Sequence, residues 1–175
     1  CSEPNAMVLG TVQENQPSSR TVLLKRFDKK GFVFFTNFGS RKAREILQNS
    51  NVSLLFPWYA LERQVIILGS AEKINKEESL SYFQSRPRNS QISAWVSEQS
   101  KIVQSRIELE NKLNQTKKRF EGKEVPLPNY WGGFRIIPIE FEFWQGRENR
   151  LHDRFIYQLE NEKSVNIWSI SRLCP

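Results

Sequence analysis

The chain has 175 residues, 38% of them hydrophobic and 12% aromatic, which suits one packed domain and excludes a disordered chain. With two cysteines, Cys1 and Cys174, and one histidine, His152, it has neither a disulfide framework nor a metal site of several His or Cys ligands. A net charge of +7 is compatible with a solvated basic surface, with nucleic-acid binding or with sites for small phosphate esters.

The N-terminal sequence CSEPNAMVLGTV lacks the charged and apolar regions of a secretory signal peptide. No apolar run in the chain approaches the length of a membrane span. We therefore expect an intracellular, cytoplasmic protein without a membrane partner, in line with its two isolated terminal thiols. A strand-like run begins within a few residues of Cys1, which indicates a fragment that lacks an N-terminal segment.

The first part of the chain predicts short strands with hairpin-length connections. Strands are expected over residues 7–13, 20–25 and 31–37, with a turn at 14–17 and a polar stretch at 28–30. Ser40 is placed to cap a helix over 41–48. The β-branched and aliphatic residues of 51–57 and 63–73 predict two further strands of a buried sheet or barrel wall.

The middle of the chain predicts helices over 76–85, 90–96 and 102–120, the last with Glu108 and Lys112 placed as an ion pair. Strands return over 133–145, 154–160 and 165–170, with turns at 146–149 and 161–164. Because we find no repeat and no linker, we expect a single domain over 1–175. The simplest architecture is mainly β, a β-barrel with peripheral helices.

Basic residues gather at strand ends and helix starts. Arg20 and Lys25 bracket an apolar strand, and a spacing of five places them on opposite faces unless the strand bends. Arg41 and Lys42 begin a helix, where free backbone N–H groups and the helix dipole also favour an anion. Each cluster alone is more often solvated surface, but with the Thr36 hydroxyl upstream the second indicates a monophosphate pocket.

A further anion site is indicated after the helix over 76–85. Tyr82 lies one helical turn before Arg86, and Ser90 opens the next helix. A turn with exposed arginines and Ser90 as a capping residue is equally compatible with this pattern.

The only histidine lies between two arginines. Strand alternation places Arg150, His152 and Arg154 on one face, and Leu151 and Asp153 on the other. Asp153 is poorly placed to orient the neighbouring imidazole, which argues against a Ser-His-Asp triad. A lone histidine is usually structural, but its position between two guanidiniums favours contact with a ring hydroxyl of a ligand.

Amide and aromatic side chains complete the candidates. Gln64 lies in an otherwise apolar strand and needs a polar partner, which the polar atoms of a bound ligand would provide. Trp144 and the segment 95–100 add aromatic surface and polar donors. We interpret Trp95 and Trp131 as packing residues.

Seven longer motifs occur in the chain: RTVLLK (20–25), GSRKA (39–43), LLFPW (54–58), ERQV (62–65), YFQSRPRNSQISAWVSEQS (82–100), VPLPNYWGGFR (125–135) and EFWQGRENRLHDR (142–154). In this order, over nearly the whole chain, they resemble the pyridoxamine 5′-phosphate oxidase family. The resemblance implies an FMN-binding split β-barrel and a homodimer with two active sites at its interface. It also implies oxidation of pyridoxamine or pyridoxine 5′-phosphate to pyridoxal 5′-phosphate, with hydride transfer from C4′ to flavin N5 and reoxidation by O2 to give H2O2.

The resemblance also assigns roles to residues, none of them in a metal site. Cofactor-binding residues would be Arg20, Lys25, Phe35, Thr36, Arg41, Lys42, Gln64, Gln99, Ser100, Trp144 and Arg154, some of them from the partner subunit. Substrate-binding residues would be Lys25, Tyr82, Arg86, Ser90, Arg150 and His152, the last two being the candidate catalytic residues over the pyridine ring.

Two departures from the family pattern matter. Phe35 stands where many relatives have tyrosine, which is tolerable if the backbone makes the contact there. Relatives also carry a segment before EPNAMVL that can fold over the substrate, and this chain lacks it, so substrate closure is expected to weaken while cofactor binding survives.

Two other functions compete with this interpretation. One is a flavin-binding split barrel with another substrate, but a mere flavin binder needs no second anion site around Arg86 and Ser90. The other is a basic nucleic-acid-binding module, which requires solvent-facing stripes of Lys and Arg with exposed aromatic residues. Here the basic residues lie singly at strand ends and helix starts, so we expect discrete phosphate sites and no nucleic-acid partner.

Overall fold

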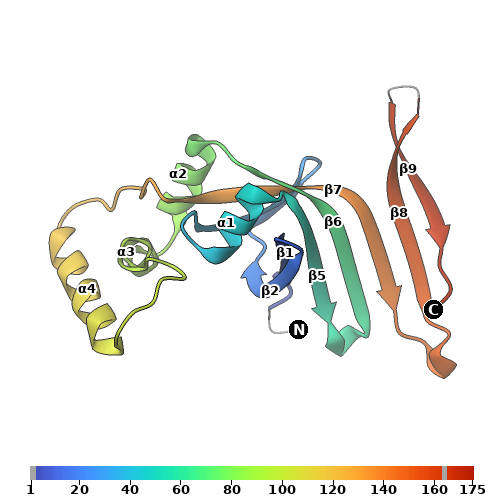
Figure 1. The fold of residues 1–175 in the computed structure, drawn as a ribbon, viewed down its shortest axis with the longest axis horizontal. Coiled ribbons are helices and arrows are strands. Elements are labelled where there is room, and N and C mark those ends of the chain that lie inside the picture. Colours follow the sequence, from blue (N-terminus) through green and yellow to red (C-terminus); the bar gives the residue numbers. More distant parts are fainter. Residues whose placement is uncertain (1–2, 163–164) are drawn as a thin grey trace.

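The computed structural model describes residues 3–162 and 165–175, and in this part nine strands form one antiparallel sheet (Figure 1). The strands are β1 (Ala6–Gln13), β2 (Gln16–Leu23), β3 (Arg26–Asp28), β4 (Gly31–Asn37), β5 (Asn51–Trp58), β6 (Arg63–Lys73), β7 (Trp131–Gln145), β8 (Asp153–Glu162) and β9 (Val165–Arg172). The helices are α1 (Arg41–Gln48), α2 (Lys76–Ser85), α3 (Arg88–Val96) and α4 (Arg106–Arg119), with short 3-10 helices η1 (Tyr59–Leu61) and η2 (Glu148–Arg150). Among the described residues no helix is long and apolar enough to cross a membrane.

Strand β7 joins two parts of the sheet. Along one edge it pairs with β6 for most of its length. Along the other edge it pairs with β4 up to Ile136 and then with β8 from Glu140 onward. The neighbour changes around Pro138 and Ile139. Pro138 has no backbone N–H, and Ile139 is a bulged residue that has no partner on β6.

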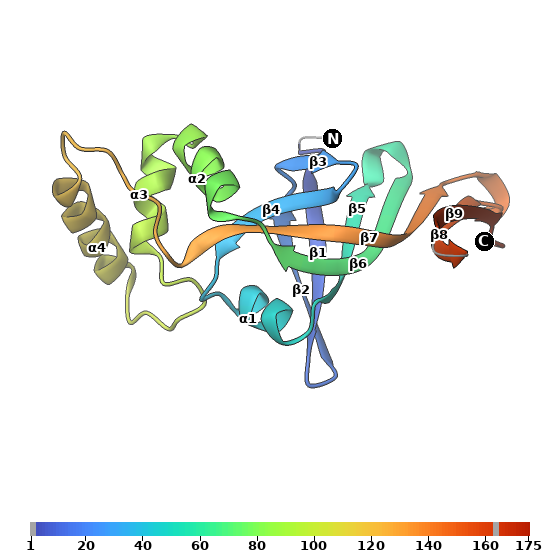
Figure 2. The same cartoon turned by 90° about the horizontal axis from the view of Figure 1, so that it is seen from above.

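The first seven strands curl into an open barrel in the order β2-β1-β5-β6-β7-β4-β3. Just after the end of β2, the chain approaches β4. The Lys25 N–H there donates to the Val33 carbonyl on β4 at 2.9 Å. No ladder joins the end strands β2 and β3 in the part of the chain that the structure describes, so the barrel stays split. The predicted mainly β split barrel with peripheral helices is confirmed, and Figure 2 shows the helices beside the barrel.

The molecule has two apolar clusters, which share β7. The first fills the barrel beneath α1 and consists of Met7, Leu9, Phe34, Ala43, Ile46, Val52, Leu54, Phe56, Ile67, Phe134 and Ile136. The second lies among α2, α3, α4 and the start of β7 and consists of Phe83, Ile92, Ala94, Phe120, Val125 and Trp131. Since burial of apolar side chains is the main favourable term in folding, the first half of β7 is held firmly from both sides.

The helices largely follow the predictions. Helix α1 begins after Ser40, whose hydroxyl accepts the Ala43 N–H at 3.4 Å, and α2 has the expected bounds. Helix α3 begins two residues early, after Pro87, so the interpretation of Ser90 as a capping residue is wrong. Helix α4 begins four residues later than predicted, after a cap by Ser105. Its predicted ion pair between Glu108 and Lys112 forms at 2.9 Å.

The second predicted strand has different bounds. A two-residue turn at Glu14 and Asn15, both with positive φ (49° and 65°), joins β1 to β2, so β2 begins at Gln16. Because β2 ends at Leu23, Lys25 lies in the bend before β3 rather than on the strand. Strand β3 was not predicted, since its three residues are exposed and carry no apolar alternation.

The C-terminal prediction needs one correction. Strand β8 begins at Asp153, and Arg150 lies in η2 with a φ of 60°, so strand alternation does not relate Arg150 to His152. The predicted turn at 161–164 lies partly outside the described residues. Strands β7 and β9 carry large apolar side chains that are exposed in the single chain: Ile137, Ile139, Phe143, Ile167, Trp168 and Ile170.

Replacement of Gly31 by alanine should lower the free energy of unfolding by about 3 kcal/mol. Gly31 follows the β3–β4 turn with a φ of 131°, and a Cβ there would overlap the Ile136 carbonyl oxygen on β7. Gly122→Ala is a matched control, since Gly122 also has a positive φ (66°) but a Cβ there would meet nothing within 4 Å. The control should lose only about 1 kcal/mol in chemical denaturation, and equal losses would contradict the proposed overlap.

Candidate functional site

A cavity of about 360 Å³ lies where the barrel meets α1, α2 and α3. Seven of the predicted site residues line it: Lys25, Phe35, Thr36, Lys42, Tyr82, Arg86 and Gln99. The bend after β2 supplies Lys25, and β4 supplies Phe35 and Thr36. Lys42 and Tyr82 come from α1 and α2, Arg86 from the link between α2 and α3, and Gln99 from the loop after α3. The structure thus brings together side chains that are up to 74 positions apart in the sequence, from Lys25 to Gln99.

One part of this cavity is built around a buried lysine. Lys42 is 9% exposed and donates to the Thr36 hydroxyl at 3.2 Å and to the Gln99 side-chain oxygen at 3.3 Å. Burial and then the charge of Arg20 lower the pKa of Lys42. Both of its hydrogen-bond partners are neutral, and no carboxylate lies within ion-pair distance of it among the described residues. An anion in the cavity would compensate this buried charge.

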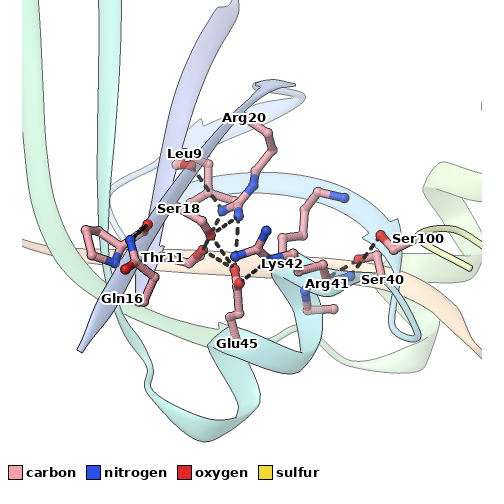
Figure 3. Close-up of polar contacts among 12 residues, drawn as sticks. Leu9, Thr11, Gln16, Ser18, Arg20, Ser40, Arg41, Lys42, Glu45 and Ser100 are labelled. Carbon is pink, nitrogen blue, oxygen red and sulfur yellow. Dashed lines mark hydrogen bonds and ion pairs between the residues drawn. The ribbon is translucent and has the colours of Figure 1, made fainter. Parts of the chain in front are cut away.

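The start of α1 adds further groups that suit an anion, shown in Figure 3. The Arg41 N–H donates to the Ser100 hydroxyl at 3.0 Å, which ties the loop after α3 to the helix start. Three cationic side chains, Arg20, Arg41 and Lys42, surround one carboxylate, that of Glu45. This leaves an excess of two positive charges at a helix N-terminus, which matches a phosphate monoester of charge near −2. The donor set therefore fits the phosphate of FMN.

The other part of the cavity is aromatic. The Phe35 and Tyr82 rings stack at a centroid distance of 3.9 Å, and Phe35 also stacks on Trp131 at 5.5 Å. The Arg86 guanidinium lies over Trp131 at 4.8 Å, and its Nη1 is buried without a hydrogen-bond partner in the described part of the chain. Burial lowers the pKa of Arg86. A buried guanidinium nitrogen without an acceptor suits a second anion.

Trp131 is a cavity residue that the sequence did not reveal, since we interpreted it only as packing. Nothing in the sequence distinguished Trp131 from a core residue, because most tryptophans lie in cores or interfaces. Ser90 does not line the cavity; it lies in the first turn of α3, and Ser93 and Ala94 from the following turn are lining residues instead.

A second group of predicted residues lies at the far end of β7. Gln64, Trp144 and His152 line another cavity, of about 450 Å³. His152 Nδ1 accepts the Arg147 N–H at 3.1 Å, and its ring lies 4.8 Å from that of Trp144. The Asp153 carboxylate binds Arg147 rather than His152, in agreement with the argument against a triad.

Two arginines of the second group lie apart from that cavity in the single chain. Arg154 donates from Nε to Glu142 at 2.8 Å and from Nη1 to the Cys174 carbonyl at 2.9 Å. Arg150 is exposed in η2.

The two groups do not meet within one chain. The cavities share no lining residue, and Figure 1 shows α2, α3 and α4 at the end of β7 opposite to β8. A strand rises about 3.3 Å per residue, so Trp131 and Trp144 lie on the order of 40 Å apart along β7. A site that uses both groups would therefore need two chains.

Comparison with known proteins agrees with this geometry. Residues 1–119 match the family model described as pyridoxamine 5′-phosphate oxidase, and residues 131–175 match that of the pyridoxine 5′-phosphate oxidase C-terminal dimerisation region. The chain is 58% identical to a pyridoxine/pyridoxamine 5′-phosphate oxidase of Prochlorococcus marinus, covering 99% of this chain and 78% of the relative. It is 55% identical to that of Escherichia fergusonii, with the same shares covered.

Solved structures have the same fold. PhzG from Burkholderia lata 383, solved in complex with tetrahydrophenazine-1-carboxylic acid, superposes with a TM-score of 0.91 at 28% identity, covering 98% of this chain and 83% of that one. A pyridoxamine 5′-phosphate oxidase-related, FMN-binding protein from Nostoc punctiforme superposes with a TM-score of 0.76, covering 98% and 88%. At 16% identity that second likeness concerns the fold alone. With both family models and relatives above 50% identity matched over almost its full length, the chain belongs to the pyridoxine/pyridoxamine 5′-phosphate oxidase family.

Proposed function

We propose that this chain is an FMN-dependent oxidase that converts pyridoxamine 5′-phosphate or pyridoxine 5′-phosphate to pyridoxal 5′-phosphate. The observation that carries the proposal is a single cavity with two separate cationic positions, Lys42 at one and Arg86 at the other. Cofactor and substrate each carry a phosphate, and a phosphate monoester has a charge near −2 above its second pKa of about 6. The relatives at 55% and 58% identity are oxidases of this type by name.

The cofactor phosphate is assigned to the start of α1. Arg41 and Lys42, with Arg20 behind them, would supply the positive charge, and Thr36 and Ser100 would supply hydroxyl donors. Lys42 is already desolvated, so an anion that reaches it meets a charge that water does not screen. Gln99 and the Phe35 backbone are the other assigned contacts on this side of the cofactor.

The substrate phosphate is assigned to the aromatic part of the cavity. Arg86 would bind it with the buried Nη1 that has no other acceptor, together with Lys25 and the Tyr82 hydroxyl. Stacking of Tyr82 on Phe35 fixes the phenol before the substrate arrives, which reduces the conformational entropy lost on binding. Ser90 lies one helical turn from the lining residue Ala94 and is retained as a weaker candidate.

The remaining assigned residues would come from the partner subunit of a homodimer. These are Gln64, Trp144, Arg150, His152 and Arg154, which lie at the far end of β7 in the same chain. Two-fold symmetry brings the same pair of surfaces together twice, so a dimer would contain two complete sites at its interface. The match of residues 131–175 to a dimerisation region supports this arrangement.

When bound, FMN would supply the redox chemistry, as a hydride acceptor that dioxygen reoxidises with formation of hydrogen peroxide. The chain's own residues orient the substrate for this reaction. Arg150 and His152 would cover the pyridine ring, and the hydrogen bond from the Arg147 N–H leaves Nε2 of His152 as the ring nitrogen that faces a ligand. Holding both reactants in one geometry is the contribution of the protein to the rate.

The first prediction concerns the reaction itself. Anaerobic addition of pyridoxamine 5′-phosphate to the FMN-loaded chain should bleach the visible flavin bands, and air should restore them. Pyridoxamine without its phosphate is the control and should bleach far more slowly, because Arg86 has nothing to bind. Flavin that stays oxidised would contradict the oxidase function, and a chain that takes up no FMN would contradict the cofactor.

The second prediction separates substrate from cofactor binding. Arg86→Ala should raise the KM for pyridoxamine 5′-phosphate roughly 10- to 100-fold while FMN affinity stays unchanged, since a charge-assisted hydrogen bond to the substrate phosphate is lost. Arg88→Ala is the matched control; Arg88 lies two residues away but donates to the Phe120 carbonyl outside the cavity. Steady-state kinetics and flavin fluorescence give the two quantities, and an unchanged KM would remove Arg86 from the substrate site.

The third prediction tests whether two subunits share each site. Arg86→Ala and Arg150→Ala chains, each of low activity alone, should regain about a quarter of wild-type activity when co-expressed, because about half of the dimers are mixed and contain one intact site. The control combines Arg86→Ala with Lys25→Ala, both from the first group, and should regain nothing. Failure of the first pair to exceed its parents would contradict a shared site.

A further inference from the structure

The carboxylate of Glu45 is fully buried in the second turn of α1, beneath the cluster of cations (Figure 3). Its Oε2 accepts hydrogen bonds from the Thr11 hydroxyl at 2.5 Å, the Ser18 hydroxyl at 2.9 Å and Arg20 Nη2 at 2.9 Å. Its Oε1 accepts Arg41 Nε at 2.7 Å. Donors from β1, β2 and α1 thus converge on one side chain, and the roles assigned above leave it out.

This carboxylate remains ionised. Burial alone would raise its pKa, but hydrogen bonds from Thr11, Arg41 and Ser18 and the charge of Arg20 bring the pKa down to about 2. A buried carboxylate is tolerated only when its oxygens are satisfied in this way. Near neutral pH, Glu45 is therefore a fixed negative charge to which the surrounding donors are attached.

Glu45 holds the two arginines differently. The Arg41 side chain is 59% exposed and gives only Nε to Glu45, so its two terminal nitrogens have no partner among the residues that the structure describes. The Arg20 side chain is 19% exposed and gives both terminal nitrogens to Glu45, Ser18 and β1. Arg20 is thus a fixed charge behind the site. Glu45 holds the guanidinium of Arg41 in one orientation, but the two terminal nitrogens of Arg41 are available to an anion.

We propose that Glu45 is a positioning residue for the cofactor phosphate, which holds Arg20 and Arg41 in the orientation in which the start of α1 binds an anion. This inference rests on the proposed function, because it takes the FMN phosphate as that anion. The exposed pair of Arg106 and Glu110 on α4 has the same four-residue spacing and the same Nε–Oε1 contact, at 2.9 Å. It provides a reference for the effect of such a pair away from the cavity.

The test compares the affinities of the flavin-free chain for FMN and for riboflavin, which lacks the phosphate, by flavin fluorescence quenching. Glu45→Ala should lower FMN affinity at least about 10-fold and leave riboflavin affinity within about twofold, because only the phosphate contact depends on the oriented arginines. A general folding defect would lower both affinities together. Glu110→Ala should change neither.

Conservative variants keep the test decisive if Glu45→Ala does not fold. Glu45→Gln keeps one acceptor oxygen, enough for one of the two arginines, while its NH2 group would face the donors of the other, so it should recover only part of the preference for FMN over riboflavin. Glu45→Asp is one methylene short of both arginines and should lose several-fold of that preference. An unchanged preference in Glu45→Ala, or in Glu45→Asp if the alanine variant is unfolded, would overturn this inference alone. A wild-type chain that binds FMN no better than riboflavin would instead overturn the proposed placement of the phosphate, and with it the role of Glu45.

Discussion

Strand β7 fixes the distance between the two ends of the molecule. Its first half lies between two apolar clusters, and its second half pairs with β6 and β8, so neither end can move independently. A continuous strand cannot fold back to bring Trp144 to the cavity that Trp131 lines. The cationic cavity and the histidine group therefore stay separate within one chain. Under the proposed function, the stiffness of this one strand is the reason that a complete site would require association of two chains.

Within the cavity, the arrangement of charge sets what can bind. The buried Lys42 and the buried Nη1 of Arg86 lack an anionic partner in the described part of the chain, and one carboxylate, Glu45, balances part of the charge at the start of α1. Desolvated cations are unfavourable without an anion, so a phosphate ligand that entered the cavity would meet a site prepared for it. The aromatic stack of Phe35, Tyr82 and Trp131 lies beside the second of these positions, with the Arg86 guanidinium over the Trp131 ring.

Local signals in the sequence predicted much of this structure. The cap at Ser40, the bounds of β6 and α2, and the place of Arg41 and Lys42 at the start of α1 follow from hydrogen bonding and alternation among neighbours. The strand alternation assumed for Arg150 failed because Arg150, with a positive φ, ends a 3-10 helix that no residue pattern signals.

Patterns among neighbouring residues do not predict contacts between distant parts of the chain. Glu45 meets Thr11 across 34 positions, and Trp131 reaches the cavity only once the helices have packed. The family and the fold were predicted most firmly, from long motifs that resemble a known family. Such motifs imply a whole fold and therefore also its contacts between distant segments.

The outward apolar side chains of β7 and β9 have a consequence for how the protein persists in dilute solution. Ile139, Phe143 and Ile170 lie on the surface of the single chain. Covering such a surface is favourable by roughly 25 cal/mol per Å², so a second chain stabilises the fold as a ligand would. The melting temperature of such a dimer would rise with protein concentration, and dilution would weaken the fold.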